Sequence, residues 1–162
     1  MTLVSGEFLV SIVALLAALG AGLAAGVFLA FSTFVMTGLS RAPVAVGVSA
    51  MQEINRAAPN PFFMITLFGT GLLAAASSIG SAVLGGAGWP WLAAGTVSYL
   101  VCLVLTATYH VPRNNALMLV DPGVPATAAA WRTYLLEWTR MNHVRTLSAA
   151  LGCLLLIMGW SR

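Results

Sequence analysis

Amide, imidazole, guanidinium and indole side chains gather in three short segments of the chain, at residues 52–60, 110–115 and 131–145. Groups of this kind can take a proton, stabilise a developing negative charge and hold flat rings. They therefore indicate a ligand-binding site rather than a merely solvated surface. The members are Gln52, Glu53, Asn55, Arg56, Asn60, His110, Arg113, Asn114, Asn115, Trp131, Tyr134, Glu137, Trp138, Arg140, Asn142, His143 and Arg145.

Helical spacing orders the third of these segments. At about 100° per residue, one arc of roughly 80° holds the side chains of Trp131, Tyr134, Trp138, Asn142 and Arg145. The spacing predicts an aromatic and then polar stripe on one helix that runs from Ala128 into the last apolar stretch. His143 lies about 100° from the centre of that stripe. A regular helix therefore cannot turn both His143 and Arg145 into one narrow pocket.

Arg145 and His110 differ in how readily a purely structural role explains them. An arginine inside an apolar span must reach the headgroups or face a cavity or a partner, so Arg145 is a functional candidate. His110 shares a second stripe with Cys102, Thr106, Tyr109 and Arg113, but it could simply bond a backbone carbonyl. The aromatic residues of the third segment could anchor a helix at the headgroups, and Asn142 could cap a helix.

Four apolar stretches must position these side chains. Hydrophobic residues make up 60% and charged residues only 7% of the 162 residues, and an average soluble domain has about 25% charged residues. This composition excludes a soluble enzyme, a disordered protein and a nucleic-acid module. The apolar stretches span about 8–39, 62–84, 89–111 and 144–160, and each can cross the ~30 Å hydrocarbon layer. We predict an all-α fold, a four-transmembrane-helix bundle with an extra amphipathic, aromatic helical extension before the last span, as a single integral membrane domain over residues 1–162.

The arginines predict the orientation of the bundle. Basic residues stay preferentially in cytoplasmic loops, and five of the seven arginines lie at 41, 56, 113, 132 and 140. We therefore expect the loops 40–61 and 113–143 in the cytoplasm and both termini outside. The expected location is a bacterial inner or plasma membrane.

Four blocks that follow one another along the chain carry a family resemblance. They are GVFLAFSTFVM at 26–36, MQEIN at 51–55, PRNN at 112–115 and WTRMNHVRT at 138–146. The sequence resembles the anthrone oxygenase-like family of small integral membrane proteins, and the resemblance covers nearly the whole chain. Its most specific part is the Trp-x-x-x-Asn-His-x-Arg block. The resemblance implies oxidation of an anthrone to an anthraquinone with O₂ as co-substrate, without a metal or flavin.

The chemistry of that reaction gives each candidate residue a role. An anthrone must lose an acidic benzylic proton, and the resulting anion reduces O₂, so the protein supplies a base, donors for an oxyanion and a slot for flat rings. We predict the catalytic residues His143, Arg145 and Asn142. His143 is the base that the family block favours, whereas helical spacing favours His110. The predicted substrate-binding residues are Gln52, Asn55, His110, Asn114, Asn115, Tyr134 and Trp138.

Three points complete the sequence-based interpretation. The predicted activity is that of a monooxygenase, which is an oxidoreductase. The alternative is a non-catalytic binder or carrier of an apolar aromatic or lipid ligand. No cofactor is expected, and a haem or metal on His110 and His143 is not favoured, because histidines are common in membrane proteins that bind neither. Cys102 and Cys153 show no spacing typical of zinc or iron–sulfur ligands. The expected partners are an apolar aromatic or lipid-like small molecule and the lipid bilayer, without nucleic acid, and the bundle could be a monomer or a homo-oligomer.

Overall fold

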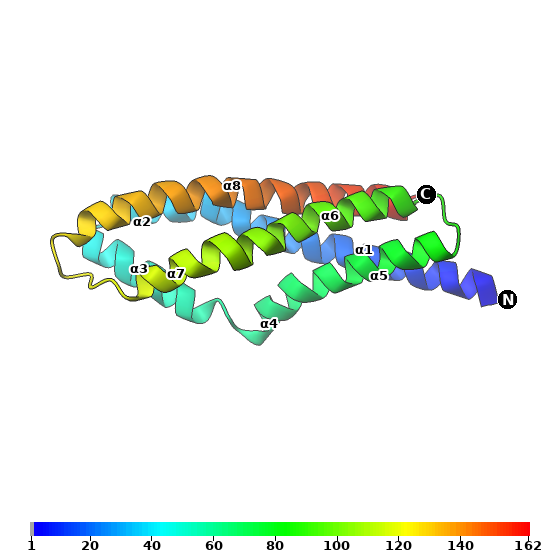
Figure 1. Cartoon of the computed structure of the whole chain (residues 1–162), viewed down its shortest axis with the longest axis horizontal. Helices are drawn as coiled ribbons and strands as arrows, with labels where there is room; N and C mark the ends of the chain where they lie inside the picture. The colour runs from blue at the N-terminus through cyan, green and yellow to red at the C-terminus, as the bar shows by residue number, and fades with distance from the viewer. Residues whose placement is uncertain (1) are drawn as a thin grey trace.

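The computed structural model describes residues 2–162, with side chains from Ser5 onward, and every regular element in this part of the chain is helical. Four helical rods lie side by side (Figure 1). Each is long and apolar enough to cross a membrane, over Ser5–Arg41, Pro61–Val83, Trp89–Met118 and Thr127–Trp160. The predicted all-α bundle of four transmembrane helices is therefore confirmed, and the rods are consistent with an integral membrane protein.

Three of the four rods contain a π turn, in which the backbone is wider than in an α-helix. The first rod joins α1 (Thr2–Ala30), η1 (Phe31–Val35) and α2 (Met36–Arg41). The second joins α4 (Pro61–Met64), η2 (Ile65–Gly69) and α5 (Thr70–Val83). The third joins α6 (Trp89–Leu105), η3 (Thr106–His110) and α7 (Val111–Met118). The fourth is α8 (Thr127–Trp160), and both η1 and η3 pack against it.

Small residues let the rods approach closely, as van der Waals packing in lipid requires. The buried face of α1 is lined by alanines, among them Ala14, Ala17 and Ala21. On α6, a Cβ at Gly95 would lie 3.0 Å from the Leu156 backbone nitrogen of α8. The backbones of α6 and α8 therefore touch at Gly95, where no larger side chain fits without a shift.

The helix α8 runs unbroken from Thr127 to Trp160. It thus includes the helical extension that the stripe of aromatic and polar residues predicts. Only residues 119–126 separate α8 from α7, so most of the segment 113–143, treated as a loop in the topology prediction, is helical.

The segment 40–61 is also not simply a loop, because it contains the helix α3 (Val44–Ala57). Its inner face is buried through Gly47, Val48, Met51 and Gln52. A Cβ at Gly47 would lie 3.1 Å from the Trp131 ring, so glycine allows α3 to lie close to α8. The apolar inner face explains why this segment folds onto the bundle.

The two ends of the bundle differ. Both termini and the turn between α5 and α6 lie at one end, whereas α3 and the loop between α7 and α8 lie at the other (Figure 1). We call the second end the α3 end.

Candidate functional site

Asn142 and Arg145 form the centre of a buried polar cluster in the half of the bundle toward the α3 end. The Asn142 side chain is fully buried, and only 6% of Arg145 is exposed. Asn142 Nδ2 donates to the Phe28 carbonyl oxygen and to Ser32 Oγ, both at 2.8 Å. The orientation of the amide is therefore fixed, and its Oδ1 accepts from Arg145 Nη2 at 2.6 Å and Nε at 3.1 Å.

The Arg145 guanidinium has neutral neighbours only. Its centre lies 3.9 Å from the Phe28 ring centroid and 5.4 Å from that of Trp138. Its Nη1 donates to Thr106 Oγ1 at 3.4 Å. In the part of the chain whose side chains are described, the ion pairs are Arg56–Glu53 and Arg113–Glu137, both at the surface. A buried cation without a carboxylate is costly and suits a site where negative charge develops.

His110 lies on η3, one turn beyond Thr106, and only 1% of it is exposed. Its Nδ1 lies 3.2 Å from the Leu105 carbonyl oxygen. Because a carbonyl oxygen only accepts, Nδ1 carries the proton in this contact, and Nε2 of the neutral ring holds the free lone pair. Nε2 is buried and completes no hydrogen bond, and the ring lies against the Trp138 backbone. The arrangement therefore leaves a base inside the cluster.

A wall of three aromatic rings borders His110. Along α8, the Trp131 and Tyr134 rings stack at 5.6 Å between centroids, and the Tyr134 and Trp138 rings at 6.4 Å. The His110 ring meets Trp138 edge-on at 5.0 Å. Asn114 Oδ1 accepts from the Tyr134 hydroxyl at 2.9 Å and from Trp138 Nε1 at 2.8 Å. Asn114 thus holds the orientation of two rings in the wall.

The two polar side chains of α3 play different parts. Gln52 Nε2 donates to the carbonyl oxygens of Leu117 at 3.0 Å and Val120 at 2.9 Å. The last carbonyls of a helix lack partners within it, so Gln52 joins α3 to the end of α7. The Asn55 side chain lies beside the Tyr134 hydroxyl, but its Nδ2 is buried without a completed hydrogen bond.

The structure brings together eight of the ten predicted site residues around this wall and leaves two outside. The eight are Gln52, Asn55, His110, Asn114, Tyr134, Trp138, Asn142 and Arg145. His143 and Asn115 are exposed. Because α8 is regular there, His143 points away from the face that buries Asn142 and Arg145. This placement agrees with the helical spacing and not with the choice of His143 that the family block favours.

Sequence reasoning missed three contacts of the cluster: Phe28 and Ser32 from the first rod, and Thr106 as a partner of Arg145. Ser32 gave a usable signal, because it is a polar residue within an apolar span. The signal for Phe28 was its place in the block 26–36, which carries the family resemblance.

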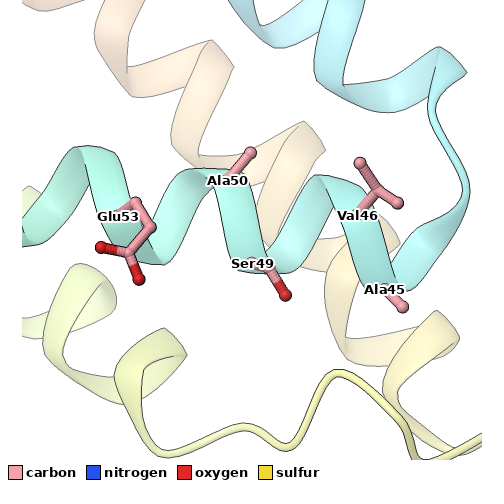
Figure 2. A pocket seen from close by; sticks show the side chains of 5 residues that line it. All are labelled: Ala45, Val46, Ser49, Ala50 and Glu53. Atoms are coloured by element: carbon pink, nitrogen blue, oxygen red, sulfur yellow. The ribbon is translucent and has the colours of Figure 1, made fainter.

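Two hollows among the described side chains lie away from the cluster. One is a shallow depression on the outer face of α3, lined by Ala45, Val46, Ser49, Ala50 and Glu53 (Figure 2). The other, of about 400 Å³, lies at the end with the termini and is lined in part by Glu7, Gly88 and Arg162. The side chains at the centre of the cluster are almost fully buried, so a ring system can reach them only if some of these side chains move.

Metal-ligand geometry is absent from the described side chains, in which no three His, Cys, Asp or Glu residues gather closely enough to hold a metal ion. Cys102 is a buried free thiol, and Cys153 is a half-buried one.

A comparison with protein families gives a match to this chain. The family model described as anthrone oxygenase matches residues 54–155, which hold most of the cluster. This match confirms the resemblance seen in the sequence blocks. No curated protein and no solved structure matches the chain.

Proposed function

Because the chain belongs to the anthrone oxygenase family, we propose that it is a membrane-embedded, cofactor-independent oxygenase that uses O₂ to oxidise a flat, apolar, anthrone-type ring system. The observation that carries this proposal is a pair of buried groups beside one aromatic ring. The Arg145 cation has no acidic partner among the described side chains, and the His110 Nε2 lone pair has no donor. A substrate that loses a proton and becomes an anion matches both groups.

The first step is removal of a proton from the ring CH₂ group. The C–H bond breaks, its electron pair enters the ring system, and the proton goes to His110 Nε2. The negative charge concentrates on the ring oxygen, where the Arg145 guanidinium stabilises it. Arg145 retains N–H groups beyond those bonded to Asn142 and Thr106. A preorganised cation in a site without water stabilises such a charge more than water would.

The second step is the reaction of this anion with O₂. The anion gives one electron to O₂, and the ring radical and superoxide combine into a C–O bond. The peroxide takes a proton from His110, and His110 then removes the second hydrogen of the carbon as a proton. The electron pair of this C–H bond forms the C=O bond as the O–O bond breaks, and the leaving hydroxide takes the proton from His110 and becomes water. One O₂ and one CH₂ group thus give one C=O group and one H₂O.

The remaining cluster residues position these groups. Asn142 holds the guanidinium through two hydrogen bonds, and Asn114 holds the Tyr134 and Trp138 rings. Stacked aromatic faces suit a flat tricyclic ring. We assign the base to His110 rather than His143, because His143 is exposed on the outer face of α8.

The proposal is tested by incubating detergent-purified, metal-stripped protein with an anthrone under ¹⁸O₂. We expect quinone absorbance to rise faster than in the spontaneous reaction, with one O₂ consumed and one ¹⁸O atom incorporated per quinone. A rate equal to that of a protein-free detergent control would refute the enzymatic role.

The same assay separates the oxygenase from the carrier alternative, which the stacked wall of Trp131, Tyr134 and Trp138 also suits. A carrier would bind the ring system without forming product. Quenching of tryptophan fluorescence by an anthraquinone, without quinone formation from the anthrone, would favour the carrier.

A further inference from the structure

Two buried side-chain atoms in the described part of the molecule lack any hydrogen-bond partner: Asn55 Nδ2 and His110 Nε2. Leaving a buried polar atom unpaired destabilises the folded protein. Such atoms are rare in folded proteins, and each one calls for an explanation. The proposed reaction uses His110 Nε2 but leaves Asn55 Nδ2 without a role.

The two unpartnered atoms lie along the same aromatic wall. The Asn55 side chain is next to the Tyr134 hydroxyl, and the His110 ring contacts Trp138. The Tyr134 and Trp138 rings are stacked and share one acceptor, Asn114 Oδ1. The two nitrogen atoms therefore border the same pair of stacked rings.

The chemistry of the two atoms is complementary. An amide Nδ2 only donates, whereas the free imidazole Nε2 accepts. The partner of Asn55 must therefore be an acceptor, such as a phenol, phenolate or carbonyl oxygen, while His110 faces the group that loses a proton. We propose that Asn55 is a specificity-determining residue and binds an oxygen substituent on the outer ring of the substrate, an inference that rests on the proposed function.

Secondary structure supports this assignment, because α3 presents Asn55 rigidly. Gln52, one turn earlier on α3, is bonded to the Leu117 and Val120 carbonyls. Met51 and Val48 are buried beneath the same helix. The donor is thus held in place before the substrate arrives, which lowers the entropic cost of binding.

The test compares the binding of two stable quinones, so that no turnover is needed. Unsubstituted anthraquinone and 1-hydroxyanthraquinone are titrated into the detergent-purified protein, and the quenching of tryptophan fluorescence is recorded. We expect the wild type to bind the hydroxylated quinone about tenfold more tightly, the value of one hydrogen bond of ~1.4 kcal/mol. Asn55→Leu, which keeps the size of the side chain but has no donor, should bind both quinones equally.

Two further variants complete the test. Asn55→Asp is nearly isosteric and replaces the donor with an acceptor, so it should lose the preference without a change in packing. Glu53→Gln lies on the outer face of the same helix (Figure 2) and should keep it. If both Asn55 variants fold, by circular dichroism, and still prefer the hydroxylated quinone as the wild type does, or if the wild type shows no preference, the proposal is overturned.

Failure of this proposal can be told apart from failure of the proposed function. A protein that shows an Asn55-dependent preference but no quinone formation recognises the ring oxygen without being an oxygenase. A protein that oxidises anthrones but binds both quinones equally is an oxygenase in which Asn55 does not select the substrate.

Discussion

The charge of Arg145 is the feature of the cluster that folding alone does not explain. Asn142 and Thr106 bond it, and the Phe28 ring covers it, but these neighbours are neutral. An ionised residue within a span is costly and is usually retained for a function. A substrate anion supplies the missing negative charge, so the site should be most stable when that anion is bound.

Replacement of Arg145 by glutamine tests this role. Arg145→Gln keeps an N–H donor for Asn142 Oδ1 and removes the positive charge. We expect quinone formation to fall about 10²- to 10³-fold, as for loss of one oxyanion donor, with the helix content unchanged. The measurement is kcat/KM with circular dichroism of the same samples. Arg140→Gln, at an exposed position of α8, is the matched control, and equal activity of both variants would return Arg145 to a structural role.

The two histidines of the chain provide a second matched pair. His110→Ala removes the buried base, and turnover should fall about 10²- to 10⁴-fold, the usual contribution of general base catalysis. His143→Ala changes an exposed side chain and should leave turnover unchanged. The readout is the initial rate of quinone formation at saturating anthrone. A loss of turnover in His143→Ala alone would assign the base to the residue of the family block.

Residue spacing predicts part of this cluster and not the rest. The stripe from Trp131 to Arg145 is buried throughout, because α8 is regular and one face of it must meet the bundle. The same regularity places His143 outside. The free Nε2 of His110 could not be predicted, since it depends on which backbone carbonyl the opposite ring nitrogen meets.

At the scale of elements, the π turns shape the cluster. Two carbonyl oxygens beside or within them accept from side chains: Leu105 from His110 Nδ1 and Leu67 from the Tyr99 hydroxyl. A π turn disturbs the regular hydrogen-bond pattern of a helix and occurs often at functional sites. Here the turns η1 and η3 bring Ser32, Thr106 and His110 to the face of α8 that carries Asn142 and Arg145.

The sequence does not predict these turns, because the spans are apolar on nearly every face and a shift of one residue in the helical phase leaves no break in the pattern. It also does not predict α3 in the segment 40–61. Arg41 and Arg56 predict only the orientation of this segment in the membrane. The helix depends instead on its buried inner face of Gly47, Val48 and Met51. The four spans were predictable, since length and hydropathy alone decide them.

The contact of Gln52 with α7 gives a prediction about α3 as an element. Gln52→Ala leaves the Leu117 and Val120 carbonyls without their side-chain donor. We expect a cost of about 1–3 kcal/mol, felt locally as looser docking of α3. Hydrogen exchange followed by mass spectrometry should show faster exchange over 44–57 and no change in α6. Glu53→Ala is the control, because its exposed ion pair with Arg56 contributes little, and unchanged exchange in Gln52→Ala would show that burial alone holds α3.

At the scale of the whole molecule, polar chemistry and positive charge share one end. Asn55, His110 and Arg145 lie toward the α3 end. Five arginines lie in that half as well, at positions 41, 56, 113, 132 and 140. The other end carries Arg162 beside the turn between α5 and α6. A substrate with an apolar ring body and polar oxygens could thus enter from the bilayer with its oxygens toward the α3 end.

The arginine distribution predicts that the α3 end faces the cytoplasm and that both termini lie outside. The test is labelling of cysteine variants in intact cells with a membrane-impermeant maleimide. Ser161→Cys, exposed beside the C-terminus, should be labelled in intact cells. Gly123→Cys, exposed in the loop between α7 and α8, should be labelled only after the membrane is permeabilised. The wild-type chain, whose two cysteines lie within spans, gives the background. The opposite pattern would place the α3 end outside and would mean that the arginines are retained for the site rather than for topology.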